Sequence, residues 1–198
     1  MNPNDLQPHE LMQRFADFCE AHAISYRVVG SMASIAYGEP RLTIDIDIVA
    51  ELRLSDLTAV CSAFPFPEYY LSEDAARDAI LRRRQFNIIH PASGLKVDVF
   101  VPPQTEYAGS EAQRVRRITS AGEYSAWFGS PEDIVLNKLI YYQKSNRVSE
   151  KHLRDIAGMM KLLREKLDRE YIERWAAKLG VTAEWELVRQ RVDETRRE

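Results

Sequence analysis

The stretch YRVVGSMASIAYGEPRLTIDIDIV, Tyr26–Val49, contains the pattern that decides the fold. A short apolar strand runs into Gly30-Ser31, and a spacer of thirteen residues then leads to Asp45-Ile46-Asp47-Ile48. Because side chains alternate along an extended strand, Asp45 and Asp47 should share one face, while Ile44, Ile46 and Ile48 face the core. Two carboxylates held this close repel each other unless a cation lies between them. The pattern therefore predicts a divalent-metal site that needs a third ligand.

A later strand, Leu95–Val101, supplies a candidate for that ligand, because Asp98 lies there among apolar neighbours. Aspartate is disfavoured within strands and is rarely buried without a partner. If this strand pairs with the Asp45–Ala50 strand, Asp98 completes a cluster of three carboxylates. Such oxygen ligands suit Mg²⁺ or Mn²⁺, and a glycine at a helix N-terminus lets the backbone approach a phosphate.

Composition narrows the class of protein. The chain has 198 residues, 45% hydrophobic and 29% charged, with a net charge of -3, which is ordinary for a globular protein and argues against an overall polycation. Cys19 and Cys61 have neither metal-ligand spacing nor the density of a disulfide framework, as expected in a reducing compartment. The N-terminus lacks signal-peptide features, and no apolar run approaches the ~20 residues that cross a bilayer. We therefore expect a cytoplasmic protein without a membrane partner.

Secondary-structure patterns change character about two-thirds of the way along the chain. The first part mixes helices with strands, and from Ser130 onward almost every pattern is helical. Ser130-Pro131-Glu132-Asp133 is typical of a helix start, with a cap, proline at the first position and acids in the first turn. The expected fold class is α+β, with a C-terminal helical bundle. The expected strands are 25–29, 45–50, 85–90, 95–101, 117–119 and 124–128, and the expected helices are 5–23, 32–37, 54–64, 72–81, 130–144, 149–166, 168–179 and 182 to near the C-terminus.

The Gly-Ser pair, the Asp-x-Asp strand and the later apolar-Asp-apolar strand together resemble the signature of the nucleotidyltransferase superfamily related to DNA polymerase beta. The closer likeness is to the minimal bacterial branch that includes AbiEii and MenT-type toxins, whose Arg-x-Thr-x-Asp-x-Asp pattern is matched from Arg41 to Asp47. Two helical motifs of that branch resemble Pro131-Glu132-Asp133 followed by Lys138, and Lys151–Asp155.

The resemblance implies a small mixed sheet flanked by helices in residues 1–129 and a helical lobe in residues 130–198. It implies transfer of a nucleoside monophosphate from a nucleoside triphosphate, with Mg²⁺ or Mn²⁺ held by Asp45, Asp47 and Asp98. The third of these would also help to deprotonate the acceptor hydroxyl. The nucleotide-binding residues implied are Gly30, Ser31, Arg41, Thr43, Lys138 and Asp155.

The sequence leaves the acceptor open. A toxin-like enzyme would modify tRNA or a protein and would have an antitoxin partner, and the runs Arg82–Arg84 and Arg114–Arg117 are candidates for RNA contacts. Such runs are more often a solvated face. An aminoglycoside acceptor would instead need an acidic pocket. A catalytically idle nucleotide sensor of the same fold is a further alternative. Lys138 could be an ordinary surface lysine, and Asp155 a helical partner of Lys151.

Overall fold

A computed structural model of the protein describes residues 6–38, 42–120 and 122–195. The chain divides into two compact units, which we describe separately. The first contains the described residues up to Met32 and those from Leu42 to Phe128. The second contains those from Ala33 to Gly38 and those from Gly129 onward.

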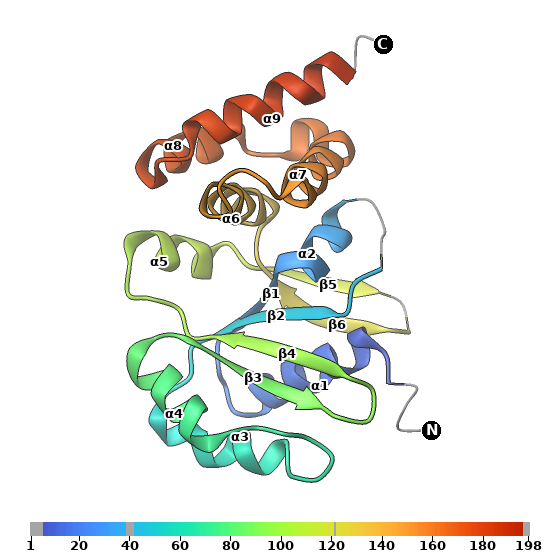
Figure 1. The fold of residues 1–198 in the computed structure, drawn as a ribbon, viewed down its shortest axis with the longest axis vertical. Coiled ribbons are helices and arrows are strands. Elements are labelled where there is room, and N and C mark those ends of the chain that lie inside the picture. Colours follow the sequence, from blue (N-terminus) through green and yellow to red (C-terminus); the bar gives the residue numbers. More distant parts are fainter. Residues whose placement is uncertain (1–5, 39–41, 121, 196–198) are drawn as a thin grey trace. The chain divides into compact units, whose positions relative to one another are not determined.

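The first unit is built on a mixed sheet of six strands with the order β3-β4-β2-β1-β6-β5 (Figure 1). β1 pairs with β2 in antiparallel and with β6 in parallel orientation, and β2 pairs in parallel with β4. The hairpins β3–β4 and β5–β6 form the two edges of the sheet. The strands are β1 (Tyr26–Val29), β2 (Asp45–Ala50), β3 (Gln85–His90), β4 (Leu95–Phe100), β5 (Arg116–Ser120) and β6 (Tyr124–Phe128).

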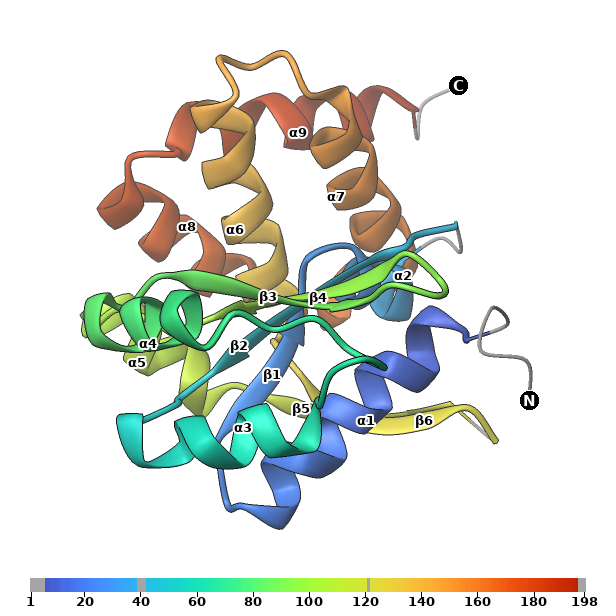
Figure 2. The same cartoon turned by 60° about the horizontal axis from the view of Figure 1, so that its bottom comes forward.

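Helices cover both faces of this sheet. Adjacent residues of β1 show the two sides, because Tyr26 donates a hydrogen bond to Glu20 of α1 while Arg27 pairs with Glu111 of α5. Successive strand residues point to opposite faces, so α1 and α5 lie on opposite sides. On the α1 side, α4 packs against β3 and α3 packs against α4 (Figure 1, Figure 2). The helices of this part are α1 (Pro8–Ala21), α2 (Gly30–Tyr37), the 3-10 turn η2 (Leu54–Asp56), α3 (Leu57–Ala63), α4 (Glu73–Arg82) and α5 (Glu106–Gln113).

The core of the first unit lies between α1 and the sheet. Ile46 and Ile48 of β2 are fully buried, and so is Phe15 of α1, which stacks on Phe64. The prediction that the interleaved isoleucines face the core is therefore correct for these two and wrong for Ile44, which is 67% exposed. Ile44 precedes the first paired residue of β2, so the alternation of strand faces does not extend to it.

The second unit is a bundle in which α6 contacts α7, α8 and α9. The start of α6 follows the sequence pattern: Ser130 accepts a hydrogen bond from the amide of Asp133, and Pro131 takes the first helical position. None of the described helices has the length and apolar character that crossing a membrane requires. The elements are α6 (Pro131–Lys144), α7 (Glu150–Leu163), the 3-10 turn η3 (Arg164–Lys166), α8 (Arg169–Leu179) and α9 (Thr182–Thr195).

Candidate functional site

The parallel pairing of β2 with β4 brings the predicted carboxylates to one face of the sheet. Asp47 is the register partner of Asp98, and Asp45 is the partner of Lys96. Register partners in neighbouring strands project to the same side, so all four side chains share that side. The two strands are neighbours in the sheet, which is the condition under which Asp98 joins the other two carboxylates. We call the surface formed by Asp45, Asp47, Lys96 and Asp98 the carboxylate face.

Gly30 lies directly against this face. Its φ is 61°, a conformation that disfavours side chains, and a Cβ added there would lie 2.0 Å from Oδ2 of Asp47. The Asp47 carboxylate therefore occupies the space that any other residue at position 30 would fill. Ser31, the next residue of α2, is 7% exposed. The structure thus explains the glycine at position 30.

Thr43 lies two residues before the start of β2. Its Oγ1 accepts a hydrogen bond from the backbone N–H of Asp45 at 3.3 Å, which orients the first carboxylate of the strand. Arg41, the other residue of the Arg-x-Thr-x-Asp-x-Asp pattern, lies outside the described residues. The contact shown by Thr43 is structural, and the predicted contact of these two residues with a nucleotide remains a prediction.

Asp98 is held by two residues that the sequence patterns did not single out. Asn87, its register partner on β3, donates to Oδ1 of Asp98, and Nζ of Lys96 donates to Oδ2 at 2.7 Å. The side chain of Asp98 is 10% exposed, against 44% for Lys96. The hydrogen bond to Asp98 raises the pKa of Lys96, and the carboxylates of Asp45 and Asp47 act in the same direction. The strand alternation could have indicated Lys96, which stands two positions before Asp98.

The carboxylate face fits a hard divalent ion by the chemistry of its donors. Carboxylate oxygens from Asp45, Asp47 and Asp98 are the ligands that Mg²⁺ and Mn²⁺ prefer, and softer ligands do not occur in β2 or β4. Within residues 6–38, 42–120 and 122–195, however, no three His, Cys, Asp or Glu side chains are arranged to hold a metal ion. Asp98 is instead bound to the Lys96 ammonium, so the predicted carboxylates share a face without forming a metal cage.

The two site residues predicted in the second unit form a buried ion pair. Nζ of Lys138 donates to Oδ2 of Asp155 at 2.7 Å, and the two side chains are 6% and 9% exposed. His152 lies near this pair: burial lowers its pKa, the positive charge of Lys138 lowers it further, and Asp155 opposes the shift. Lys138 is therefore not an ordinary surface lysine. A contact of either residue with a nucleotide remains a prediction.

The Pro131-Glu132-Asp133 motif has a structural role within the bundle. Oε1 of the fully buried Glu132 accepts from the backbone N–H of Asp168 at 3.1 Å, and Asp133 accepts from the hydroxyl of Tyr171 at 2.7 Å. Asp168 is the N-cap of α8. These contacts join the start of α6 to the start of α8, which gives a physical reason for two buried acids at this position.

Three arginines of the two runs are paired with carboxylates. In the first run, Arg82 pairs with Asp78 at 2.6 Å and Arg83 with Glu51 at 2.9 Å. In the second, Arg117 pairs with Glu20 at 2.5 Å and also lies over the ring of Trp127. These ion pairs favour the interpretation that the arginines form a solvated face over the interpretation that they contact RNA.

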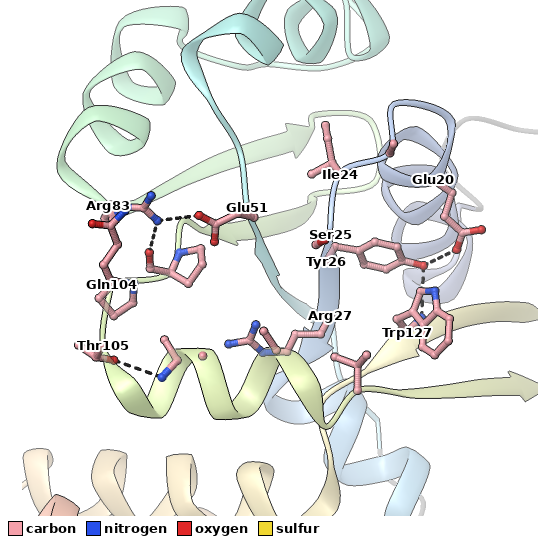
Figure 3. Close-up of a pocket in the computed structure, with 17 residues that line it drawn as sticks. Glu20, Ile24, Ser25, Tyr26, Arg27, Glu51, Arg83, Gln104, Thr105 and Trp127 are labelled. Atoms are coloured by element: carbon pink, nitrogen blue, oxygen red, sulfur yellow. Dashed lines mark hydrogen bonds and ion pairs between the residues drawn. The ribbon is translucent and has the colours of Figure 1, made fainter.

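A cavity of about 580 Å³ opens at the opposite end of β1 and β2 (Figure 3). The register places Tyr26 opposite Ala50 at this end and Val29 opposite Asp47 at the other. None of the predicted site residues lines the cavity. Figure 3 shows Arg27 over α5 and Arg83 bound to Glu51, so the charged groups of the wall are partnered. The cavity is therefore separate from the candidate site.

Comparison with known proteins supports the fold. No family model matches the sequence, and no curated protein matches it significantly. The crystal structure of ANT(2")-Ia in complex with adenylyl-2"-tobramycin matches with a TM-score of 0.61 and 14% identity, over 87% of this chain and 96% of the other. The lincomycin-bound lincosamide antibiotic adenylyltransferase LnuA matches with a TM-score of 0.52 and 12% identity, over 80% of this chain and 99% of the other.

A third match is an antigenic nucleotidyltransferase-like protein from Paracoccidioides brasiliensis, with a TM-score of 0.52 and 18% identity over 78% of this chain and 76% of the other. At these identities the likeness establishes the fold alone. The protein has a nucleotidyltransferase-like α+β fold, as the sequence predicted.

Proposed function

We propose that this protein is a nucleotidyltransferase that moves a nucleoside monophosphate from a nucleoside triphosphate to an acceptor hydroxyl. One observation carries the proposal: Asp45, Asp47 and Asp98 share one face of β2 and β4, with Asp47 lying against Gly30. Like-charged side chains side by side are costly, so their grouping calls for a cationic ligand. The likeness in fold to adenylyltransferases supports the same reaction class.

The residues have separate roles in this proposal. Asp45 and Asp47 would hold a Mg²⁺ or Mn²⁺ ion, which when bound would offset the negative charge of the triphosphate. Gly30 and Ser31, at the start of α2, offer backbone N–H groups to the phosphates. Asp98 accepts the proton of the acceptor hydroxyl. The oxygen of that hydroxyl then bonds to the α-phosphorus as the bond to the β-phosphate oxygen breaks, and pyrophosphate leaves.

The other predicted nucleotide-binding residues complete the proposal. Thr43 orients Asp45, and Arg41 binds the nucleotide or pairs with a neighbouring acid. Lys138, held by Asp155, provides a positive charge to a triphosphate oxygen. Replacing Lys138 by methionine tests its proposed contact through the affinity for the triphosphate.

A small hydroxyl-bearing molecule is the acceptor that the observations favour. Of the structures with a similar fold, ANT(2")-Ia is in complex with adenylyl-2"-tobramycin, and LnuA is bound to lincomycin. Arg82, Arg83 and Arg117 are bound to carboxylates, which leaves less positive charge for an RNA backbone. Membership of the AbiEii or MenT-type branch, a tRNA or protein acceptor, an antitoxin partner and a cytoplasmic location remain predictions from the sequence.

A transfer assay tests the proposal. The purified protein is incubated with Mg²⁺ or Mn²⁺ and each α-³²P-labelled nucleoside triphosphate, with aminoglycosides and lincosamides, total tRNA or total protein as acceptors. A double variant, Asp45→Asn with Asp47→Asn, runs beside the wild type, and Glu51→Gln serves as a matched control at the far end of β2.

Label transferred by the wild type and the control, but not by the double variant, is the expected result. Transfer to tRNA or protein instead of a small molecule would overturn the acceptor and support the toxin-like reading. Metal-dependent nucleotide binding without transfer to any acceptor would favour an idle sensor. Absence of nucleotide binding would refute the nucleotidyltransferase function.

A further inference from the structure

Lys96 brings a positive charge to the carboxylate face. Its Nζ lies 2.7 Å from Oδ2 of Asp98, and its backbone position is the register partner of Asp45. The side chain is 44% exposed, so the stem runs at the surface while the ammonium reaches the carboxylates. β2 and β4 contain four charged residues, and Lys96 is the only basic one among them.

The charges of these two strands suggest how many metal ions the face can take. Three carboxylates and one ammonium leave two formal negative charges, which a single divalent ion balances. A pair of divalent ions together with Lys96 would leave an excess of positive charge at close range. Cations this close repel each other strongly, even when water screens part of the interaction.

We propose that Lys96 is a positioning residue whose ammonium replaces a second divalent ion at Asp98, so that the nucleotide-free protein binds one Mg²⁺ or Mn²⁺ at Asp45 and Asp47. This inference rests on the proposed function, because it assumes that the carboxylate face is a metal site. Asn87, which donates to the other oxygen of Asp98, fixes that carboxylate toward Lys96.

Counting bound Mn²⁺ in the absence of nucleotide tests the inference. The protein is titrated with Mn²⁺, and the free ion is measured by electron paramagnetic resonance. We expect one bound ion for the wild type. Lys96→Met removes the charge and keeps the apolar stem, so we expect a second bound ion and about tenfold tighter binding of the first.

Three further variants separate the charge from other effects. Lys96→Arg keeps the charge and should retain one ion. Lys96→Gln is a second neutral variant, which replaces Lys96→Met in the experiment if that variant folds poorly. It should show the same second bound ion and the same tighter binding. Lys161→Met removes an exposed lysine of α7 in the second unit, and should leave the number of ions and their affinity unchanged.

Thermal unfolding gives an independent readout. Without Lys96 the three carboxylates repel one another, so saturating Mn²⁺ should raise the melting temperature of Lys96→Met by more than that of the wild type. Equal Mn²⁺ number and affinity in the wild type, Lys96→Met and Lys96→Gln would refute the role of Lys96 while leaving the metal site intact. Two ions bound to the wild type would refute it as well. No Mn²⁺ binding by any variant would refute both the metal site and this inference.

Discussion

The two ends of one sheet face use charged residues in opposite ways. At the end of β1 that leads into Gly30, the neighbouring strands carry three carboxylates and one ammonium. At the other end, around the cavity, each basic group has its own acid: Arg27 binds Glu111, and Arg83 binds Glu51. The pairs at the balanced end link β1 to α5 and the chain after β2 to the chain after α4, whereas the unbalanced end is the one that we propose as a cation site. The two ends therefore differ in the ratio of acidic to basic side chains, and the predictions below test whether this ratio distinguishes a binding site from a structural ion pair.

The largest expected effect comes from removing charge at the unbalanced end. Replacing Asp47 by asparagine should reduce nucleotidyl transfer by at least about 1,000-fold, because the proposed metal site would lose a ligand. The free energy of unfolding should stay the same or rise, because repulsion between carboxylates decreases. Transfer assays and urea unfolding without metal measure both quantities. A large loss of stability would indicate that the carboxylate face is structural.

Removing charge at the balanced end should give the reverse result. Glu111→Gln leaves the Arg27 guanidinium buried without its carboxylate, which should cost about 3 kcal/mol of unfolding free energy. The two side chains of this pair are 9% and 7% exposed. Transfer measured at a temperature where the variant is folded should change less than about threefold, or less than ~0.7 kcal/mol.

Glu51→Gln is the control for that experiment, because it breaks an exposed pair in the wall of the same cavity. Exposed pairs contribute about 0–1 kcal/mol, so the loss of stability should be much smaller than that of Glu111→Gln. Equal losses in urea unfolding would mean that burial does not distinguish the two pairs, and would remove the basis for calling this end structural.

Two glycines with similar backbone conformations allow a sharper test of the carboxylate face. Gly30 and Gly94 have φ values of 61° and 72°, but only a Cβ at Gly30 would meet Asp47. Alanine at either position should cost about 1 kcal/mol for its left-handed conformation. Gly30→Ala should in addition displace Asp47 and reduce transfer about 100-fold, whereas Gly94→Ala should retain it. Equal activity in the two variants would contradict a precise placement of Asp47.

The smallest expected effect concerns the buried pair of the second unit. Because burial and the charge of Lys138 lower the pKa of His152 in the folded protein, the unfolded chain keeps this proton to higher pH. Stability should therefore fall as the pH decreases through the ordinary value of 6.5 and toward the lower pKa of the folded state.

Thermal unfolding between about pH 8 and pH 5 measures this effect. His152→Gln should give a flatter dependence than the wild type over that range. Identical curves would show that His152 titrates alike in both states, and that the Lys138–Asp155 pair does not act on it.

The strands of the candidate site were predictable because their residues carry local signals. The alternation of apolar and charged side chains indicated β2 and β4. Asp98 was recognised because an aspartate is unusual within an apolar strand. Helix α5 was missed, because its sequence is polar and Gly109 lowers its helix propensity. Its Glu111 binds Arg27 on β1, a contact between distant parts of the chain that no local pattern contains.

The sequence by itself determined which residues carry charge and which side of its own strand each one takes, because the alternation of side chains is a local property of the backbone. Only the tertiary structure decided that Asp47 lies opposite Asp98 and Asp45 opposite Lys96. Strand order and register depend on hydrogen bonds between segments far apart in the chain. The three carboxylates were therefore predicted from local patterns, whereas the placement of the Lys96 ammonium opposite Asp45 comes from the register.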